Sequence, residues 1–123
     1  KLRRFRRMYG GGMRQAGLLA AAGIFALEHN IARLKEDHDH AKRLAHLLAQ
    51  VPAVTLDLKS VETNIIFFDV KSSRPPADLV AALKAEGVLI NAVGGNTYRA
   101  VTHLDVSADD IDRAGQIFSR VFT

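Results

Sequence analysis

The chain contains no cysteine and no tryptophan, and only 3 of its 123 residues are proline. Without cysteine, a disulfide framework, a thiolate nucleophile and a cysteine-based zinc site are all excluded. This absence fits a reducing compartment, and we predict a cytoplasmic protein. The longest apolar run, AGLLAAAGIFAL, is too short to span a bilayer and is followed by EHN. We therefore predict no association with a membrane.

Aromatic residues are also scarce, at 7% of the chain. This scarcity helps to decide whether the positive charge of the chain indicates nucleic-acid binding. The formal net charge is +4, but the first seven residues, KLRRFRR, supply more than all of it. One interpretation is a basic arm that contacts nucleic acid. The other is the exposed side of a short helix whose Leu2 and Phe5 face inward. Because no series of aromatic residues is available for base stacking, we favour the helix and expect no nucleic-acid partner.

Apolar periodicity and turn residues predict an ordered series of elements along the chain. A helix over 13–28 is apolar nearly all round, and an amphipathic helix covers 31–51. Short strands then fall within 51–58 and 62–71. They are followed by a helix in 72–87, strands over 88–93 and 97–106, and a final helix capped by Ser107. From residue 54 onward, this order indicates a small sheet with helices on one face.

The helix over 13–28 does not fit that layer, because an all-round apolar helix must be buried against other helices or another subunit. The remainder of the chain hardly provides such a partner. We therefore expect the sequence to be the later part of a longer protein, cut in the middle of a domain.

Two arginines are candidate anion-binding residues. Arg14 is expected one position inside the helix that follows Gly10, Gly11 and Gly12. A helix start with free N–H groups and a nearby arginine suits a phosphate, although the glycines could simply allow close packing. Arg99 lies within an otherwise apolar strand, on the face opposite Tyr98. Its charge cannot be shed, so it needs either a carboxylate ligand or a salt bridge to an acid of this chain.

The histidines give weaker signals. His103 and Asp105 share one face of the strand expected over 97–106, where they could form a metal pair or a base with its orienting acid. No third group is evident, so a hydrogen-bonded structural histidine is the preferred interpretation. His38 and His40 are two positions apart on a helix and point to different faces, which indicates a solvated surface. We predict no metal site.

The segments RRFRRMYGGGMRQAGLLAAAGIFALEHNIARLKEDH, ETNIIFFDV and VLINAVGGNTYRAVTHLDVS resemble, in the same order, segments of the low-specificity L-threonine aldolases. The most specific parts are GGGMRQ and the closing pattern R-x-V-T-H-x-D-V. The resemblance implies a PLP-dependent, transferase-like α/β fold (fold type I). It places residues 1–30 at the end of the large, PLP-binding domain and residues 31–123 in the small C-terminal α+β domain.

The resemblance also implies an activity and a set of sites. These enzymes use pyridoxal 5'-phosphate to cleave β-hydroxy-α-amino acids such as threonine and allo-threonine to glycine and an aldehyde. A base removes the β-hydroxyl proton, and the cofactor ring accepts the electrons of the broken Cα–Cβ bond. Arg99 matches the arginine that pairs with the substrate carboxylate. Arg7 and Arg14 match basic positions near the cofactor phosphate, reached from a neighbouring subunit of a homotetramer.

The sequence departs from the family pattern because it begins after the Schiff-base lysine. The histidine that stacks on the cofactor and the acid facing the pyridine nitrogen are also missing. We therefore expect no catalytic residue in this chain and no activity of the chain alone. Two alternatives stay open: another fold-type I PLP lyase, and a stand-alone binding module with a basic N-terminal arm.

Overall fold

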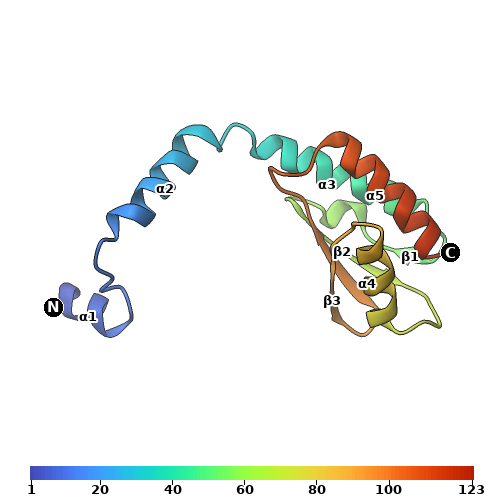
Figure 1. Ribbon diagram of the computed structural model, residues 1–123, viewed down its shortest axis with the longest axis horizontal. Helices are drawn as coiled ribbons and strands as arrows, with labels where there is room; N and C mark the ends of the chain where they lie inside the picture. Colours follow the sequence, from blue (N-terminus) through green and yellow to red (C-terminus); the bar gives the residue numbers. More distant parts are fainter. The chain divides into compact units, whose positions relative to one another are not determined.

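The computed structural model describes residues 1–123 and divides them into two compact units, Lys1–Leu34 and Lys35–Thr123. Figure 1 shows the first unit in blue and the second in colours from cyan to red. No helix in the structure combines the length and the apolar character that crossing a membrane requires.

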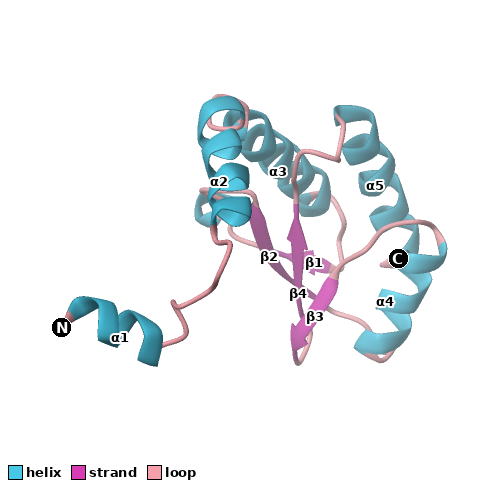
Figure 2. Cartoon of the chain, turned by 60° about the vertical axis from the view of Figure 1, so that its left-hand side comes forward, coloured by secondary structure: helices cyan, strands magenta, loops and turns pink.

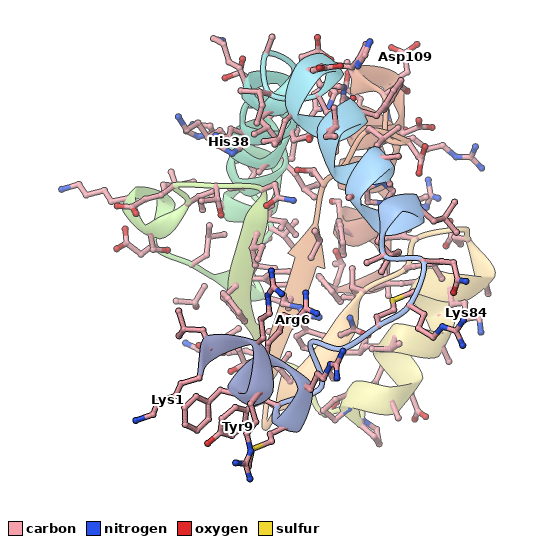
Figure 3. The ribbon with its side chains drawn as sticks, turned by 90° about the vertical axis from the view of Figure 1, so that its left-hand side faces the viewer. Lys1, Arg6, Tyr9, His38, Lys84 and Asp109 are labelled. Atoms are coloured by element: carbon pink, nitrogen blue, oxygen red, sulfur yellow. The ribbon has the colours of Figure 1, made fainter.

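The first unit consists of two helices, α1 (Leu2–Met8) and α2 (Gly17–His29), and neither contains a buried residue. The expected inward orientation of Leu2 and Phe5 is therefore wrong, since their side chains are 85% and 48% exposed. No other element of this unit covers α1, and the side chains of Arg6 and Tyr9 point away from it on opposite sides (Figure 3). As expected for α2, this unit does not bury its own apolar residues.

The glycine run forms the C-terminal end of α1 and not the start of α2. Gly10 has a φ of +83°, which favours glycine, and its N–H donates to the carbonyl of Arg7 at 3.3 Å. The N–H of Gly11 donates to the carbonyl of Arg6 at 2.7 Å, which completes a Schellman motif at the C-terminus of α1. A Cβ on Gly11 would lie 2.7 Å from the Cγ of Arg6, so this position also excludes a side chain.

The helix that follows starts later than the sequence indicates. α2 begins at Gly17, and Gln15 has a left-handed φ of +49° that interrupts any helix starting at residue 13. Arg14 therefore lies in the turn before α2 and not inside the helix. This corrects the expected position of the arginine.

The second unit contains a four-stranded antiparallel sheet with the strand order β1-β2-β4-β3. Its strands are β1 (Val54–Thr55), β2 (Ile65–Val70), β3 (Asn91–Gly94) and β4 (Thr97–Val101). Gly95 and Asn96 connect β3 to β4, which confirms the turn expected there. A short 3-10 helix, η1 (Leu58–Ser60), lies between β1 and β2.

Three helices, α3 (Leu34–Ala49), α4 (Pro76–Ala85) and α5 (Ala108–Val121), share a core with one face of this sheet, as expected (Figure 2). Prolines begin α4 and Gly87, with a φ of +89°, follows its end. Ser107 caps α5 in a capping box with Asp110. The hydrogen bonds from Ser107 hold the pKa of Asp110 below its usual value.

The centre of the core is a cluster of four aromatic rings. Phe68 of β2 contacts Tyr98 of β4 with ring centroids 5.8 Å apart, and Phe118 of α5 at 6.0 Å. Phe122 packs against all three rings. The cluster joins the two central strands to the C-terminal helix, and burial raises the pKa of the Tyr98 hydroxyl.

Helices α3 and α5 approach closely at Gly115. A Cβ on this residue would lie 2.6 Å from the Cδ1 of Leu47 and 3.0 Å from its Cβ. We expect Gly115→Ala to lower the free energy of unfolding by about 1–3 kcal/mol, because one extra methyl overpacks the contact. Urea unfolding followed by circular dichroism would measure the change.

Gly23→Ala in α2 is the matched control, because beyond the adjacent residues and the helix's own backbone no atom lies within 4 Å of the added Cβ. Alanine has the higher helix propensity, so this variant should be neutral or slightly stabilising. An equal loss of stability in both variants would contradict the close helix contact.

Candidate functional site

The candidate site is the face of the sheet that the helices of the second unit leave open. Along β2, buried and exposed residues alternate, and β4 continues the alternation in register with it. The side chains that share the open face on these strands are Ile65, Phe67, Asp69, Thr97, Arg99 and Val101. Half of these side chains are apolar, and Arg99 is the single cation among them.

Arg99 lies between two neighbours on adjacent strands. In the register of the sheet it is opposite Phe67 of β2 and Asn91 of β3. Its Nε is buried and has no hydrogen-bond partner, and no ion pair is formed by its guanidinium. The structure thus contains the mid-strand arginine that the sequence predicts, without the alternative salt bridge.

The one acid among these strand side chains is already engaged. Asp69 is opposite Thr97, whose hydroxyl donates to Oδ1 of Asp69 at 2.5 Å. Arg99 lies two positions further along β4 than Thr97. The face therefore presents a planar guanidinium that makes no ion pair within the chain and can hold a carboxylate with two parallel hydrogen bonds.

The expected strand position of His103 and Asp105 is wrong, because β4 ends at Val101. Thr102 still pairs with Asn64, through its N–H at 3.0 Å and through its carbonyl, which accepts from Asn64 Nδ2 at 2.7 Å. Beyond this pair the chain turns, and the N–H of Val106 donates to the carbonyl of His103 at 3.0 Å.

His103 and Asp105 instead belong to this exposed turn. The backbone N–H of Asp105 donates to Nδ1 of His103 at 3.3 Å, and the Asp105 carboxylate lies 3.5 Å from the same nitrogen. The contact joins neighbours in the turn, in line with a hydrogen-bonded structural histidine. His38 and His40, on α3, join no group of three or more His, Asp or Glu side chains that could hold a metal ion.

The other two sequence-predicted site residues are in the first unit. Arg7 lies in the last turn of α1, and Arg14 lies in the turn before α2. Both side chains are exposed and neither makes a hydrogen bond or an ion pair. The stem of Arg7 passes close to the chain at Gly12, where an added Cβ would lie 3.2 Å from its Cγ.

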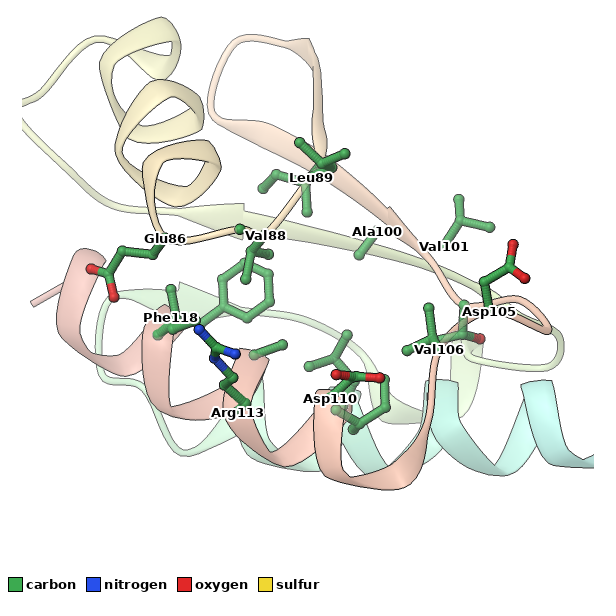
Figure 4. A pocket seen from close by; sticks show the side chains of 17 residues that line it. Glu86, Val88, Leu89, Ala100, Val101, Asp105, Val106, Asp110, Arg113 and Phe118 are labelled. Carbon is green, nitrogen blue, oxygen red and sulfur yellow. The ribbon is translucent and has the colours of Figure 1, made fainter.

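A pocket of about 360 Å³, which the sequence does not reveal, lies on the helix side of β4 (Figure 4). Its lining combines residues 86–90, the end of β4 and one side of α5, with Phe118 in its wall. Glu86 lies at one end in the picture and Asp105 at the other, while Arg99 is not part of the lining. The pocket therefore does not include Arg99, although Val101 at the end of β4 belongs both to its lining and to the open sheet face.

Comparison with known proteins identifies the wider group. The family model for beta-eliminating lyases matches residues 1–72. The low-specificity L-threonine aldolase of Escherichia coli K12 is 48% identical over 108 residues, which are 88% of this chain and 31% of that protein. The low-specificity L-threonine aldolase 1 of Arabidopsis thaliana is 37% identical over 113 residues, 90% of this chain and 32% of that protein. The chain thus spans about a third of the length of these curated relatives.

Solved structures confirm the fold class. A complex of the cystine C–S lyase C-DES with its product cysteine persulfide superposes with a TM-score of 0.69 at 20% identity, covering 85% of this chain and 28% of that chain. A C-DES mutant with glycine covalently linked to its PLP cofactor superposes with a TM-score of 0.68, also at 20% identity and the same coverage. The chain therefore has the fold of part of a fold-type I PLP enzyme.

Proposed function

This chain belongs to the beta-eliminating lyase family, and from that premise we propose that it is the C-terminal part of a PLP-dependent aldolase. The whole enzyme would cleave L-threonine and L-allo-threonine to glycine and an aldehyde. Relatives named as low-specificity L-threonine aldolases, at up to 48% identity, support this activity over the other lyases of the same fold.

The observation that carries the proposal is the unpaired guanidinium of Arg99 on the open sheet face. In the proposed enzyme, Arg99 binds the α-carboxylate of the amino acid and so fixes the orientation of its Cα–Cβ bond. The apolar side chains beside it exclude water and strengthen the ionic contact. The acid on the same face, Asp69, stays with Thr97 and leaves Arg99 free for substrate.

Arg7 and Arg14 fit a phosphate, because both are exposed cations without a partner in this chain. We assign them to the cofactor phosphate of a neighbouring subunit, where a guanidinium can make two charge-assisted hydrogen bonds. Pyridoxal 5'-phosphate, when bound, supplies an electron sink for the electrons of the broken Cα–Cβ bond. No residue of this chain is assigned to the proton transfers.

We further propose that residues 1–30 belong to the large, PLP-binding domain and residues 31–123 to the small domain. The exposed apolar side chains of α2, Leu18, Leu19, Ile24, Phe25 and Leu27, support this division. A contiguous apolar surface of this kind marks an interaction site. In the proposed enzyme it is covered within a cytoplasmic homotetramer.

Two measurements test the proposed function. The longer protein is offered L-threonine, L-allo-threonine, L-cysteine and L-cystine, and glycine and aldehyde should form from the first two only. The longer protein is also reduced with borohydride and digested, and the masses of its peptides are recorded. A pyridoxyl group should appear on a lysine outside this chain. Cleavage of cystine without cleavage of threonine would instead favour a C–S lyase, and a pyridoxyl group on this chain would show that it contains the Schiff-base lysine.

A further inference from the structure

Arg99 and Phe67 form the closest kind of cross-strand pair. The N–H of Thr102 donates to the carbonyl of Asn64, so these residues form a hydrogen-bonded pair of the antiparallel ladder. Hydrogen-bonded and non-hydrogen-bonded pairs alternate. Three positions along the register, Phe67 and Arg99 are therefore a non-hydrogen-bonded pair, in which opposing side chains approach more closely.

The Nε of Arg99 is buried although its face of the sheet is open. A buried N–H of a charged group ordinarily has an acceptor, yet this one has none. Asn91, the polar neighbour on β3, is exposed and is not its partner. No hydrogen-bond acceptor covers Nε, and Phe67 is the apolar side chain directly opposite Arg99.

We propose that Phe67 is a positioning residue. Its ring blocks access to the Nε of Arg99, so that Arg99 binds a carboxylate end-on, through Nη1 and Nη2. The identity of the carboxylate as that of an amino acid rests on the proposed function; the covering of Nε does not. A guanidinium can bind a carboxylate side-on through Nε and one terminal nitrogen, or end-on through both terminal nitrogens.

Blocking the side-on binding mode has a chemical consequence. The direction of the bound carboxylate is fixed along the axis of the Arg99 side chain, away from the sheet. The aromatic ring also restricts the rotamers of a long and flexible side chain, which lowers the entropy lost on binding. Phe67 is 53% exposed and outside the core, so it is free to serve this purpose without a large contribution to folding.

The first experiment measures hydrogen exchange of the Arg99 Nε–H by NMR in the chain labelled with ¹⁵N-arginine. Phe67→Ala should speed this exchange about tenfold or more, because the ring no longer shields the group from water. Ile65→Ala, on the same strand and face, is the matched control and should leave the rate unchanged. Phe67→Tyr should restore slow exchange, since it keeps the ring. Unchanged exchange in Phe67→Ala, or in Phe67→Leu should the alanine variant unfold, would overturn the covering role.

The second experiment titrates the same labelled chain with acetate. The Nη resonances of Arg99, assigned by their loss in Arg99→Lys, should shift progressively while the Nε resonance stays in place. In Phe67→Ala the Nε resonance should move as well, because side-on binding is then open. A shift of Nε in the unchanged chain would overturn end-on binding. If acetate moves no Arg99 nitrogen, end-on binding and the proposed carboxylate role both fail, whereas the exchange result still decides the role of Phe67.

Discussion

Arg99→Ala in the longer protein should weaken the binding of glycine and threonine by about 30-fold to several thousand-fold, with the cofactor still bound. Losing one partner of a buried, hydrogen-bonded charge pair costs about 2–5 kcal/mol, and each 1.4 kcal/mol is tenfold in affinity. The substituted side chain lies on the open face of β4, so the core beneath it is not disturbed. Glycine titration followed by the cofactor absorbance would measure both effects in one sample.

Two further variants separate the geometry of this site from its charge. Arg99→Lys keeps the positive charge but loses the planar fork, so it should recover only part of the lost affinity. Arg74→Ala removes an exposed cation from the loop before α4 and should bind glycine as the unchanged protein does. Unchanged glycine affinity in Arg99→Ala would show that another cation holds the carboxylate.

The second unit could be predicted closely because its patterns are local. Alternating exposure along β2, the prolines before α4, the glycine after it and the Ser107 cap each depend on neighbouring residues alone. The same alternation identified Arg99 as the charged residue of an otherwise apolar strand. The sheet face that carries Arg99 is open because the helices cover only the opposite face.

The errors lie where an element ends. The strand containing His103 was expected to continue, but β2 begins at Ile65 and offers no pairing partner beyond Asn64. The glycine run was assigned to a helix start, whereas its first two residues terminate α1 through backbone hydrogen bonds. In both cases the outcome depends on which carbonyl an N–H group reaches, and residue types leave that choice open.

The pocket beside α5 could not be predicted from the sequence either, and the reason is different. Its lining comes from residues 86–90, β4 and α5, which the tertiary structure brings together. Each of these segments carries an ordinary apolar pattern that already accounts for its place in the core. Nothing in the separate segments indicates a space between them.

Phe68→Ala should lower the free energy of unfolding by about 3–5 kcal/mol, a large part of the 5–15 kcal/mol typical of a whole domain. Phe68 is 2% exposed and its ring contacts Tyr98, Phe118 and Phe122. Removing the ring leaves a cavity that the two strands and α5 cannot close without losing these contacts. Urea denaturation of the chain, monitored by far-ultraviolet circular dichroism, would give the difference in stability.

Phe67→Ala is the matched control, because it removes the same ring from the adjacent residue of the same strand. Phe67 points to the open face, so its loss should cost about 0.5 kcal/mol or less, the usual range for surface positions. The contrast tests the register of the whole sheet, since a shift of one residue would exchange the two faces. A larger loss at Phe67 than at Phe68 would place Phe67 in the core and would turn Arg99, its cross-strand partner, away from the proposed substrate site.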